Sequence, residues 1–147
     1  MKPVKKIFLA IVAIITAVSF TSCDDDDYYP YYSQLPDAAN AFLSQYFYNY
    51  DIVDIDVQGY GTSTTYGVYF DSGAEAYFDY YGNWYYIQAA PGWTIPSGIV
   101  PYNIENYVYN YFYPAAGINI AQITNWGYQI TLTDWTVLNF DPSGYPL

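Results

Sequence analysis

A short apolar pattern occurs twice in the chain. Leu35-Pro36 recurs as Val100-Pro101, a shift of 65 positions. After each pair, apolar residues follow the spacing i, i+3, i+4, i+7, i+8: Ala39, Phe42, Leu43, Tyr46 and Phe47 in the first copy, and Ile104, Tyr107, Val108, Tyr111 and Phe112 in the second. That spacing is the buried stripe of a surface helix. Proline suits the first helical position, where its missing N–H would have no partner. The pattern therefore predicts one helix after each proline.

Alternating segments follow both helical patterns. Tyr66-x-Val68-x-Phe70 recurs as Tyr128-x-Ile130-x-Leu132, and Ala76-x-Phe78-Asp79-x-x-Gly82 recurs as Leu138-x-Phe140-Asp141-x-x-Gly144, both at a shift of 62 positions. Alternation with period two is typical of strands with one buried face. We expect strands near residues 52–58, 65–71, 74–80 and 84–89 in the first copy, and near 118–124, 127–133 and 136–141 in the second. Asp71-Ser72-Gly73 and Gly82-Asn83 supply turn residues.

The duplication predicts an α+β fold. Each copy is one helix followed by an antiparallel meander, and neither copy can cover its own apolar face. We therefore expect two tandem repeats that share one antiparallel sheet, with both helices on the same face. The expected domain spans residues 34–147, with repeat one at 34–89, a Pro/Gly-rich linker at 90–99 and repeat two at 100–147.

These motifs carry a family resemblance. Leu-Pro, a short helix ending in Tyr-Phe, Tyr-x-Val-x-Phe and Phe-Asp-x-x-Gly-Asn-Trp, repeated once, resemble the beta-lactamase-inhibitor-like, PepSY-like family over residues 34–146. In the second copy Tyr145-Pro146 stands in place of Asn83-Trp84, and Trp135 replaces the turn glycine Gly73. The resemblance implies the same helix-plus-sheet repeat, no catalytic residues, and an envelope lipoprotein. The family name points to inhibition of a protein, but only by analogy of fold.

The N-terminus has the three parts of an export signal. Lys2, Lys5 and Lys6 precede the apolar run Ile7 to Phe20, which is shorter than the roughly 20 residues that span a bilayer. Phe20-Thr21-Ser22-Cys23 resembles a loose lipobox. We expect residues 1–22 to be a cleaved lipoprotein signal peptide, with the membrane reached through lipid on Cys23. An uncleaved membrane anchor is the alternative.

Residues 23–33 are expected to form a tether. Asp24 to Asp27 are four consecutive carboxylates, which repel one another and stay solvated. Such an acidic run directly after the lipidated cysteine resembles the signal that sends lipoproteins to the outside of the outer membrane. The expected location is therefore the outer membrane, displayed at the cell surface. A plain spacer, with the domain on the periplasmic face, is the alternative.

Charge excludes several functions. All three basic residues are Lys2, Lys5 and Lys6, while the chain has 14 Asp and Glu and no His. The expected mature chain therefore has no side-chain cation. Nucleic acid and nucleotide binding lose the groups that neutralise phosphate, and Ser or Thr nucleophiles lose their base. We expect no enzyme activity and no cofactor.

Two chemistries need only carboxylates, namely glycoside hydrolysis and calcium binding. The best cluster is Asp51, Asp54 and Asp56, of which Asp54 and Asp56 point to one face of the expected strand 52–58. The solvent side of an amphipathic strand, with Ile55 and Val57 on the other side, explains the same pattern. Calcium binding therefore stays an open alternative.

Strand alternation also divides the sheet into two faces. The expected core face carries Val68, Phe70, Ala76, Phe78, Ile87, Ile130, Leu132, Leu138 and Phe140. The expected open face carries Tyr69, Tyr77, Trp84, Tyr86, Gln129, Thr131 and Asn139. Aromatic rings beside amides and hydroxyls are typical of recognition surfaces. The candidate ligand-binding residues are therefore Tyr69, Tyr77, Trp84, Tyr86, Gln129 and Thr131. Plain cross-strand packing of aromatics is the alternative.

Three functions remain. The first is a binding module for a protein partner, including an inhibitor of an enzyme, which would use one contiguous aromatic patch. The second is a surface glycan-binding module, in which rings line a groove beside Asn, Gln or Asp. The third is a structural surface protein without a discrete ligand. The negative charge favours a basic protein or a neutral glycan as partner over polyanions.

Overall fold

The protein is described by a computed structural model that covers residues 32–147. The predicted signal peptide 1–22, Cys23 and most of the tether 23–33 lie outside the described residues. The first described residue is Tyr32, whose backbone N–H donates to Asn40 Oδ1 at 3.0 Å, while Asn40 Nδ2 donates to the Tyr32 carbonyl at 3.0 Å. Tyr32 thus belongs to the folded domain and not to the tether. Among residues 32–147, neither helix has the length and apolarity to cross a membrane.

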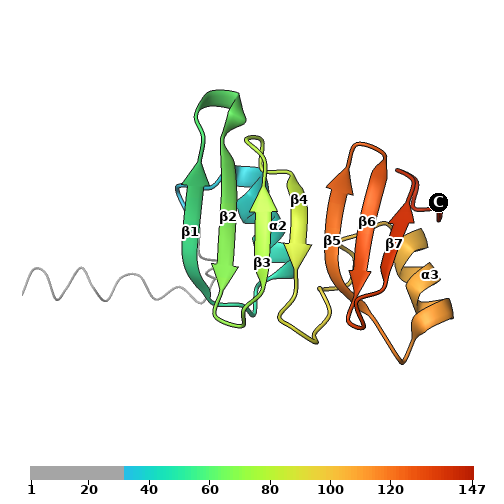
Figure 1. Ribbon diagram of the computed structural model, residues 1–147. Helices are drawn as coiled ribbons and strands as arrows, with labels where there is room; N and C mark the ends of the chain where they lie inside the picture. The colour runs from blue at the N-terminus through green and yellow to red at the C-terminus, as the bar shows by residue number, and fades with distance from the viewer. Residues whose placement is uncertain (1–31) are drawn as a thin grey trace, which may run out of the picture.

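Two α-helices, seven strands and one short 3-10 turn make up the domain (Figure 1). In chain order they are α2 (Asp37–Tyr46), β1 (Ile52–Gln58), η1 (Gly61–Ser63), β2 (Thr65–Phe70), β3 (Glu75–Phe78), β4 (Trp84–Gln88), α3 (Tyr102–Phe112), β5 (Ile118–Thr124), β6 (Gly127–Leu132) and β7 (Val137–Phe140). The predicted α+β class is confirmed, and each strand lies within about two residues of its expected bounds. Pro36 and Pro101 are the N-cap residues, one position earlier than predicted.

The strands form one sheet in the order β1-β2-β3-β4-β5-β6-β7, and every neighbouring pair is antiparallel. Strands therefore pair with their neighbours in the chain. The one join that is not a simple hairpin is β4 with β5, because residues 89–117, including α3, lie between them. That join consists of three residue pairs, Tyr86↔Gln122, Ile87↔Ala121 and Gln88↔Ile120.

Both helices cover the same face of this sheet. Phe42 of α2 meets Phe78 of β3 edge to face at 5.5 Å between ring centroids, and Tyr107 of α3 meets Phe140 of β7 in the same way at 5.5 Å. The register places Ala76, Ile87, Ala121, Ile130 and Leu138 in one row across β3 to β7. Phe78 and Phe140 are each two residues along the strand from this row, so they share its face. In Figure 1 α2 lies behind β3 and β4, and α3 is seen at the right, next to β7.

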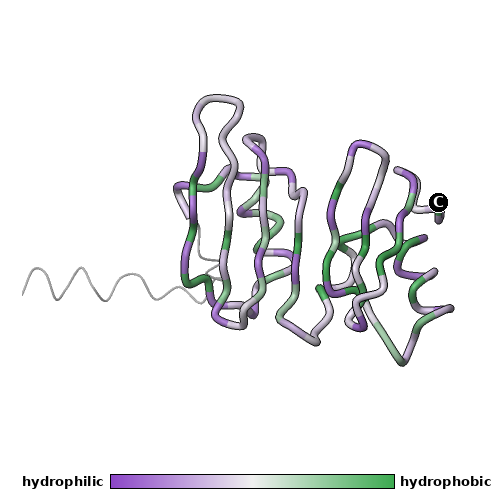
Figure 2. The backbone as a smooth tube through the Cα atoms, in the orientation of Figure 1, coloured by the Kyte–Doolittle hydropathy of each residue, from purple (hydrophilic) through white to green (hydrophobic). Residues whose placement is uncertain are grey.

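The core fills the space between the helices and the sheet. All the predicted core residues are buried except Leu138, which is half-buried and packs against the others. The helices add Ala39, Leu43, Ile104 and Val108. Figure 2 shows hydrophobic and hydrophilic stretches alternating along the strands, as expected for a sheet with one covered face. Every buried side-chain polar atom in residues 32–147 has a hydrogen-bond partner.

Two turns of the same type dock against the first turns of the helices. Asp79 Oδ1 accepts from the N–H groups of Tyr81 and Asn83, and Asp141 Oδ1 accepts from those of Ser143 and Tyr145, each at 2.9 Å. The glycine of each turn is left-handed, with φ of 85° at Gly82 and 84° at Gly144. A Cβ on Gly82 would approach Pro36 and Ala39, and one on Gly144 would approach Pro101 and Ile104. Each helix therefore begins against a glycine turn.

Candidate functional site

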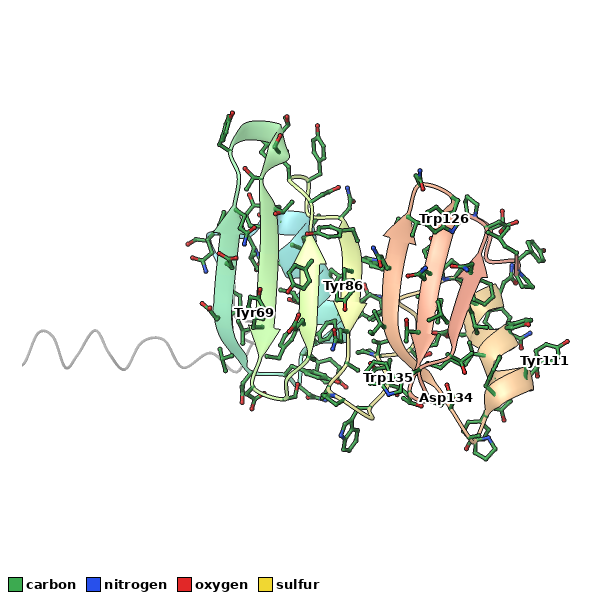
Figure 3. The ribbon with its side chains drawn as sticks, in the orientation of Figure 1. Tyr69, Tyr86, Tyr111, Trp126, Asp134 and Trp135 are labelled. Atoms are coloured by element: carbon green, nitrogen blue, oxygen red, sulfur yellow. The ribbon has the colours of Figure 1, made fainter. Side chains whose placement is uncertain are left out.

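The sheet face turned away from the helices, here called the open face, carries two straight rows of side chains. One row runs Asp56, Gly67, Tyr77, Tyr86, Gln122, Gln129 and Asn139 across β1 to β7. The other runs Asp54, Tyr69, Glu75, Gln88, Ile120, Thr131 and Val137. Figure 3 looks onto this face, with Tyr69 on β2 and Tyr86 on β4. Five of the six predicted ligand-binding residues lie in these rows.

Four tyrosines on β2, β3 and β4, here called the tyrosine cluster, surround one carboxylate. Tyr77 is at the centre, with ring centroids 5.9 Å from Tyr69, 6.2 Å from Tyr85 and 5.5 Å from Tyr86. Its hydroxyl lies 2.9 Å from Glu75 Oε2, to which it donates, and 3.2 Å from the Tyr69 hydroxyl. Gly67 leaves room for the rings, because a Cβ there would come within 3.2 Å of Tyr69 and Tyr77.

Two hydroxyls of the cluster, those of Tyr77 and Tyr86, have a raised pKa. Burial raises the pKa of Tyr77 well above its ordinary value of 10.0, and hydrogen bonds to Tyr69 and Glu75 raise it further. Burial also raises the pKa of Tyr86, with an added contribution from the negative charge of Glu75. A neutral phenol donates hydrogen bonds and presents an apolar ring. Tyr77 and Tyr86 thus present neutral phenol rings beside the carboxylate of Glu75.

A shallow hollow of about 280 Å³ opens beside the cluster, lined by Glu75, Tyr77, Tyr85, Tyr86 and Gln122. Tyr85 is not among the predicted ligand-binding residues. The ladder between β3 and β4 shifts between the pairs Tyr77↔Tyr86 and Phe78↔Trp84, so Tyr85 is an extra residue in a bulge. Because of the bulge, Tyr85 and Tyr86 both line the open face.

The prediction that Trp84 lies on the open face is wrong. Trp84 pairs with the buried Phe78, and its ring lies 6.5 Å from Phe42 of α2 and 6.5 Å from Tyr128. It packs partly buried against the core on the helix side. The physical reason is the bulge. Because Tyr85 is an extra residue, the side chains before it point to the opposite face from the one that strict alternation along β4 predicts, and Trp84 faces the helices.

The remaining predicted ligand-binding residues, Gln129 and Thr131, lie on β6, in the part of the open face formed by β5 to β7. Gln129 is in the same row as Tyr86, separated from it by Gln122, and its Nε2 lies 3.4 Å from Asn139 Oδ1. Thr131 stands in the other row, opposite Ile120 and Val137. These residues share the face of the tyrosine cluster but do not line its hollow.

The acidic residues of β1 do not gather into a metal site. Asp54 and Asp56 share the open face, as the strand pattern predicts, and Ile55 packs toward the core. Asp56 Oδ2 accepts from Gln58 Nε2 at 2.6 Å. Within residues 32–147, no group of three or more His, Cys, Asp or Glu side chains comes close enough to hold a metal ion.

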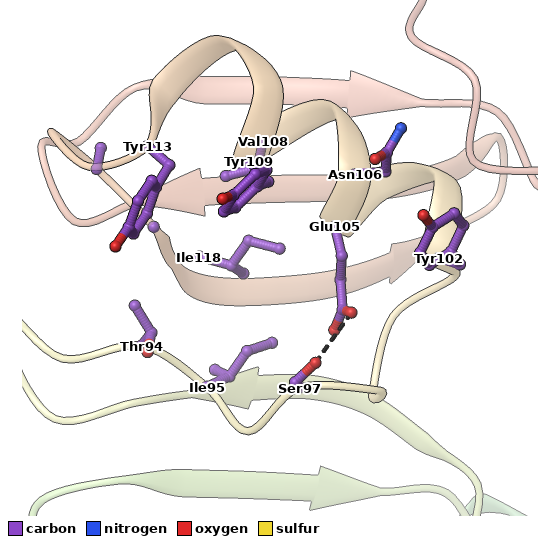
Figure 4. Close-up of a pocket in the computed structure, with 12 residues that line it drawn as sticks. Thr94, Ile95, Ser97, Tyr102, Glu105, Asn106, Val108, Tyr109, Tyr113 and Ile118 are labelled. Carbon is purple, nitrogen blue, oxygen red and sulfur yellow. Dashed lines mark hydrogen bonds between the residues drawn. The ribbon is translucent and has the colours of Figure 1, made fainter.

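A larger groove of about 670 Å³, here called the α3 groove, lies on the other side of the molecule, between α3, β5 and the linker (Figure 4). Ile95, Val108 and Ile118 form its apolar lining. Glu105 holds the linker, since its carboxylate accepts from Ser97 Oγ at 3.0 Å and from the Gly98 N–H at 2.6 Å. No motif or periodicity in the sequence indicates this groove.

Comparisons with known proteins agree with this architecture. The model of the family described as "Putative beta-lactamase-inhibitor-like, PepSY-like" matches residues 64–145, which is more than half of the chain. No curated protein sequence matches the chain.

Two solved structures from Bacteroides are similar to the whole domain. One, from Bacteroides thetaiotaomicron, is described as a "putative calcium-regulated periplasmic protein"; it is 26% identical, with a TM-score of 0.71 over 78% of this chain and 89% of that one. The other, from Bacteroides vulgatus, is described as a "putative periplasmic protein of unknown function"; it is 25% identical, with a TM-score of 0.69 over 78% of this chain and 90% of that one. Neither these neighbours nor the family description indicates a catalytic family.

Proposed function

This chain belongs to the beta-lactamase-inhibitor-like, PepSY-like family, and from that premise we propose that it is a non-catalytic binding module of the cell envelope that recognises a protein partner through its open face. The observation that carries the proposal is the tyrosine cluster around Glu75. Four neighbouring rings on a rigid sheet offer a large amphipathic contact area at a low cost in conformational entropy.

The partner that fits this face is a basic protein. Glu75 lies among the rings, Asp54 and Asp56 flank them on β1, and no lysine, arginine or histidine follows Lys6. A cationic side chain of a partner could meet both the carboxylate and the ring faces, which attract cations. Attraction of a basic surface would also speed the encounter at low salt. Inhibition of an enzyme is one form that such binding could take.

We also propose the envelope address. The lysines at the N-terminus, the apolar run and Cys23 support export and lipid anchoring in the outer membrane with surface display. The periplasmic neighbours support an envelope location and leave the periplasmic face as the alternative.

The two-repeat organisation belongs to the same proposal. It is supported by the equal ring contacts Phe42–Phe78 and Tyr107–Phe140, and by the two glycine turns, Gly82 and Gly144, at the starts of the two helices. In this organisation all four residues of the tyrosine cluster lie in the first repeat. The equivalent part of the second repeat carries Gln129, Thr131 and Asn139 instead.

A neutral glycan is the second candidate ligand. The hollow beside the cluster combines the rings of Tyr77, Tyr85 and Tyr86 with the amide of Gln122, which is the arrangement expected where sugars stack on rings and bond to amides. A structural surface protein is the third candidate, and it needs no discrete site.

The test is a binding screen of the full-length protein against envelope and secreted proteins and against neutral glycans, at low and high salt. We expect a protein hit that weakens as salt rises and that loses about tenfold or more in affinity in Tyr86→Ala. The matched control is Tyr60→Ala, since Tyr60 is 89% exposed and lies outside the cluster. A salt-insensitive glycan hit that is lost in Tyr86→Ala would support the glycan reading instead. If Tyr86→Ala binds its ligand as tightly as the unaltered protein does, the open face is not the binding site.

A further inference from the structure

The two helices border grooves at corresponding places, and only one of these grooves is filled. Beside α2, the space lined by Leu43, Tyr48, Ile52 and other residues measures about 30 Å³. Beside α3, the α3 groove measures about 670 Å³.

Several residues of the two linings stand at corresponding positions. Leu43, Ser44 and Tyr48 of the small space match Val108, Tyr109 and Tyr113 of the α3 groove at the helix shift of 65 positions. On the strand side, Ile52 pairs with Phe70 of β2, and Ile118 pairs with Leu132 of β6. Both grooves are thus bounded by the same helix surface and by the first strand that follows it.

Two tyrosines fill the space beside α2. Tyr50 lies two residues before Ile52, and its ring meets Phe47 at 5.1 Å and Phe70 at 5.5 Å, both edge to face. Tyr32 lies three residues before Leu35 and is fixed by its backbone bonds to Asn40.

The corresponding positions beside α3 carry small residues. Ala116 lies two residues before Ile118, and Ser97 lies three residues before Val100. The space that two aromatic rings occupy in the first half is therefore open in the second half. Glu105, which stands at the position of Asn40, holds the linker segment at Ser97 and Gly98 in place, just as Asn40 holds Tyr32.

We propose that the α3 groove binds an aromatic side chain presented by a polypeptide segment of a partner, in the place that Tyr50 and Tyr32 take beside α2. Tyr109 and Tyr113 supply one wall, with rings stacked at 4.9 Å and 19° between planes, and Ile95, Val108 and Ile118 supply the apolar lining. Rings of this kind pair favourably with a further aromatic ring. The occupant is a polypeptide because both fillers of the first groove are side chains held by their own backbone. This site is independent of the open face, since it lies on the helix side of the sheet.

The test uses nuclear magnetic resonance of the isotope-labelled full-length protein with three neutral probes. These are acetyl-Gly-Tyr-Gly-amide, acetyl-Gly-Ala-Gly-amide and methyl β-glucoside. We expect saturable shifts of the backbone amides of Ile95, Ala116 and Ile118 with the tyrosine peptide only, and no shift at Ile52 beside α2.

Two variants complete the test. Ala116→Tyr restores the ring that the first half carries and should abolish the shifts, and Tyr109→Ala, which removes an exposed wall ring, should weaken binding at least threefold without affecting folding. Resonances outside the groove that match those of the unaltered protein show that each variant is folded. The proposal is overturned if the alanine peptide or the glucoside produces the same shifts, if the tyrosine peptide produces none at these amides, or if folded Tyr109→Ala binds it unchanged.

Discussion

The half built on α2 and the half built on α3 hold their helices in the same way and differ at their surfaces. Phe42 meets Phe78 at 5.5 Å and 76° between ring planes, and Tyr107 meets Phe140 at 5.5 Å and 82°. Yet the tyrosine cluster belongs only to the first half, and the open groove only to the second. The contacts that fix a helix on the sheet are thus kept while its surroundings vary, and the two candidate sites arise where the halves differ.

The largest expected effect concerns the shared ring contact. Phe78→Ala and Phe140→Ala should each lower the free energy of unfolding by about 3–5 kcal/mol, because both side chains are fully buried and a cavity would remain. Urea denaturation of both variants gives the two values, with Tyr60→Ala as the exposed control. If one substitution is nearly neutral, the two helices are not held by equivalent contacts.

The glycine turns should show a smaller and unequal effect. Gly82→Ala should cost about 3 kcal/mol, because its left-handed backbone strains an L residue and the new Cβ would lie 2.7 Å from the Ala39 nitrogen. Gly144→Ala should cost only about 1–2 kcal/mol, since its nearest contacts are at 3.2 Å. Thermal unfolding compares the variants. Equal costs would show that backbone strain alone decides the effect.

A third comparison concerns the tips of the hairpins. Gly73 joins β2 to β3 with φ 89°, and Trp135 takes the same place between β6 and β7 with φ 70°. Trp135 is 73% exposed, so little packing is lost when it is replaced. Trp135→Gly should raise stability by up to about 1 kcal/mol, and Gly73→Ala should lower it by about 1 kcal/mol. A loss of stability in Trp135→Gly, measured by urea denaturation, would mean that its ring packs against the surface.

The smallest effect at neutral pH should appear in the tyrosine cluster. The folded-state pKa of Tyr77 is raised, so its contribution is fully present below the ordinary value of 10.0 and is lost as pH rises above it. Stability should therefore fall above about pH 10, and Tyr77→Phe should fall less steeply there. Urea midpoints from pH 8 to 11 measure this slope. Gln129→Ala, in the same row of the second half, should leave the slope unchanged.

Sequence patterns were sufficient to predict the helices and strands, and to predict for most strand residues which face of the sheet their side chains occupy. Buried residues such as Val68, Ile87 and Ile130 set the phase of their strands, and turn residues set the strand ends. These signals are local, so they can be read from the chain alone. Tyr69, Tyr77 and Tyr86 were placed on the open face for this reason.

The bulge and the α3 groove could not be predicted, because each depends on contacts between distant segments. Nothing in the run Asn83 to Gln88 marks Tyr85 as the extra residue, so strict alternation misplaced Trp84. The groove needs the helix, β5 and the linker to be brought together. The first half has no such groove because Tyr50 fills the corresponding space beside α2. The role of Tyr50 is seen only when the surroundings of the two helices are compared in three dimensions.

The order of the sheet bears on how the chain reaches its fold. Each strand pairs with the next in sequence, and the ladder that joins β4 to β5 consists of three residue pairs. Most native contacts are therefore close in sequence, a topology associated with rapid folding. In a nascent chain the residues of α2 and β1 to β4 are available before the remainder, so the edge of β4 is the place where β5 of the second half adds.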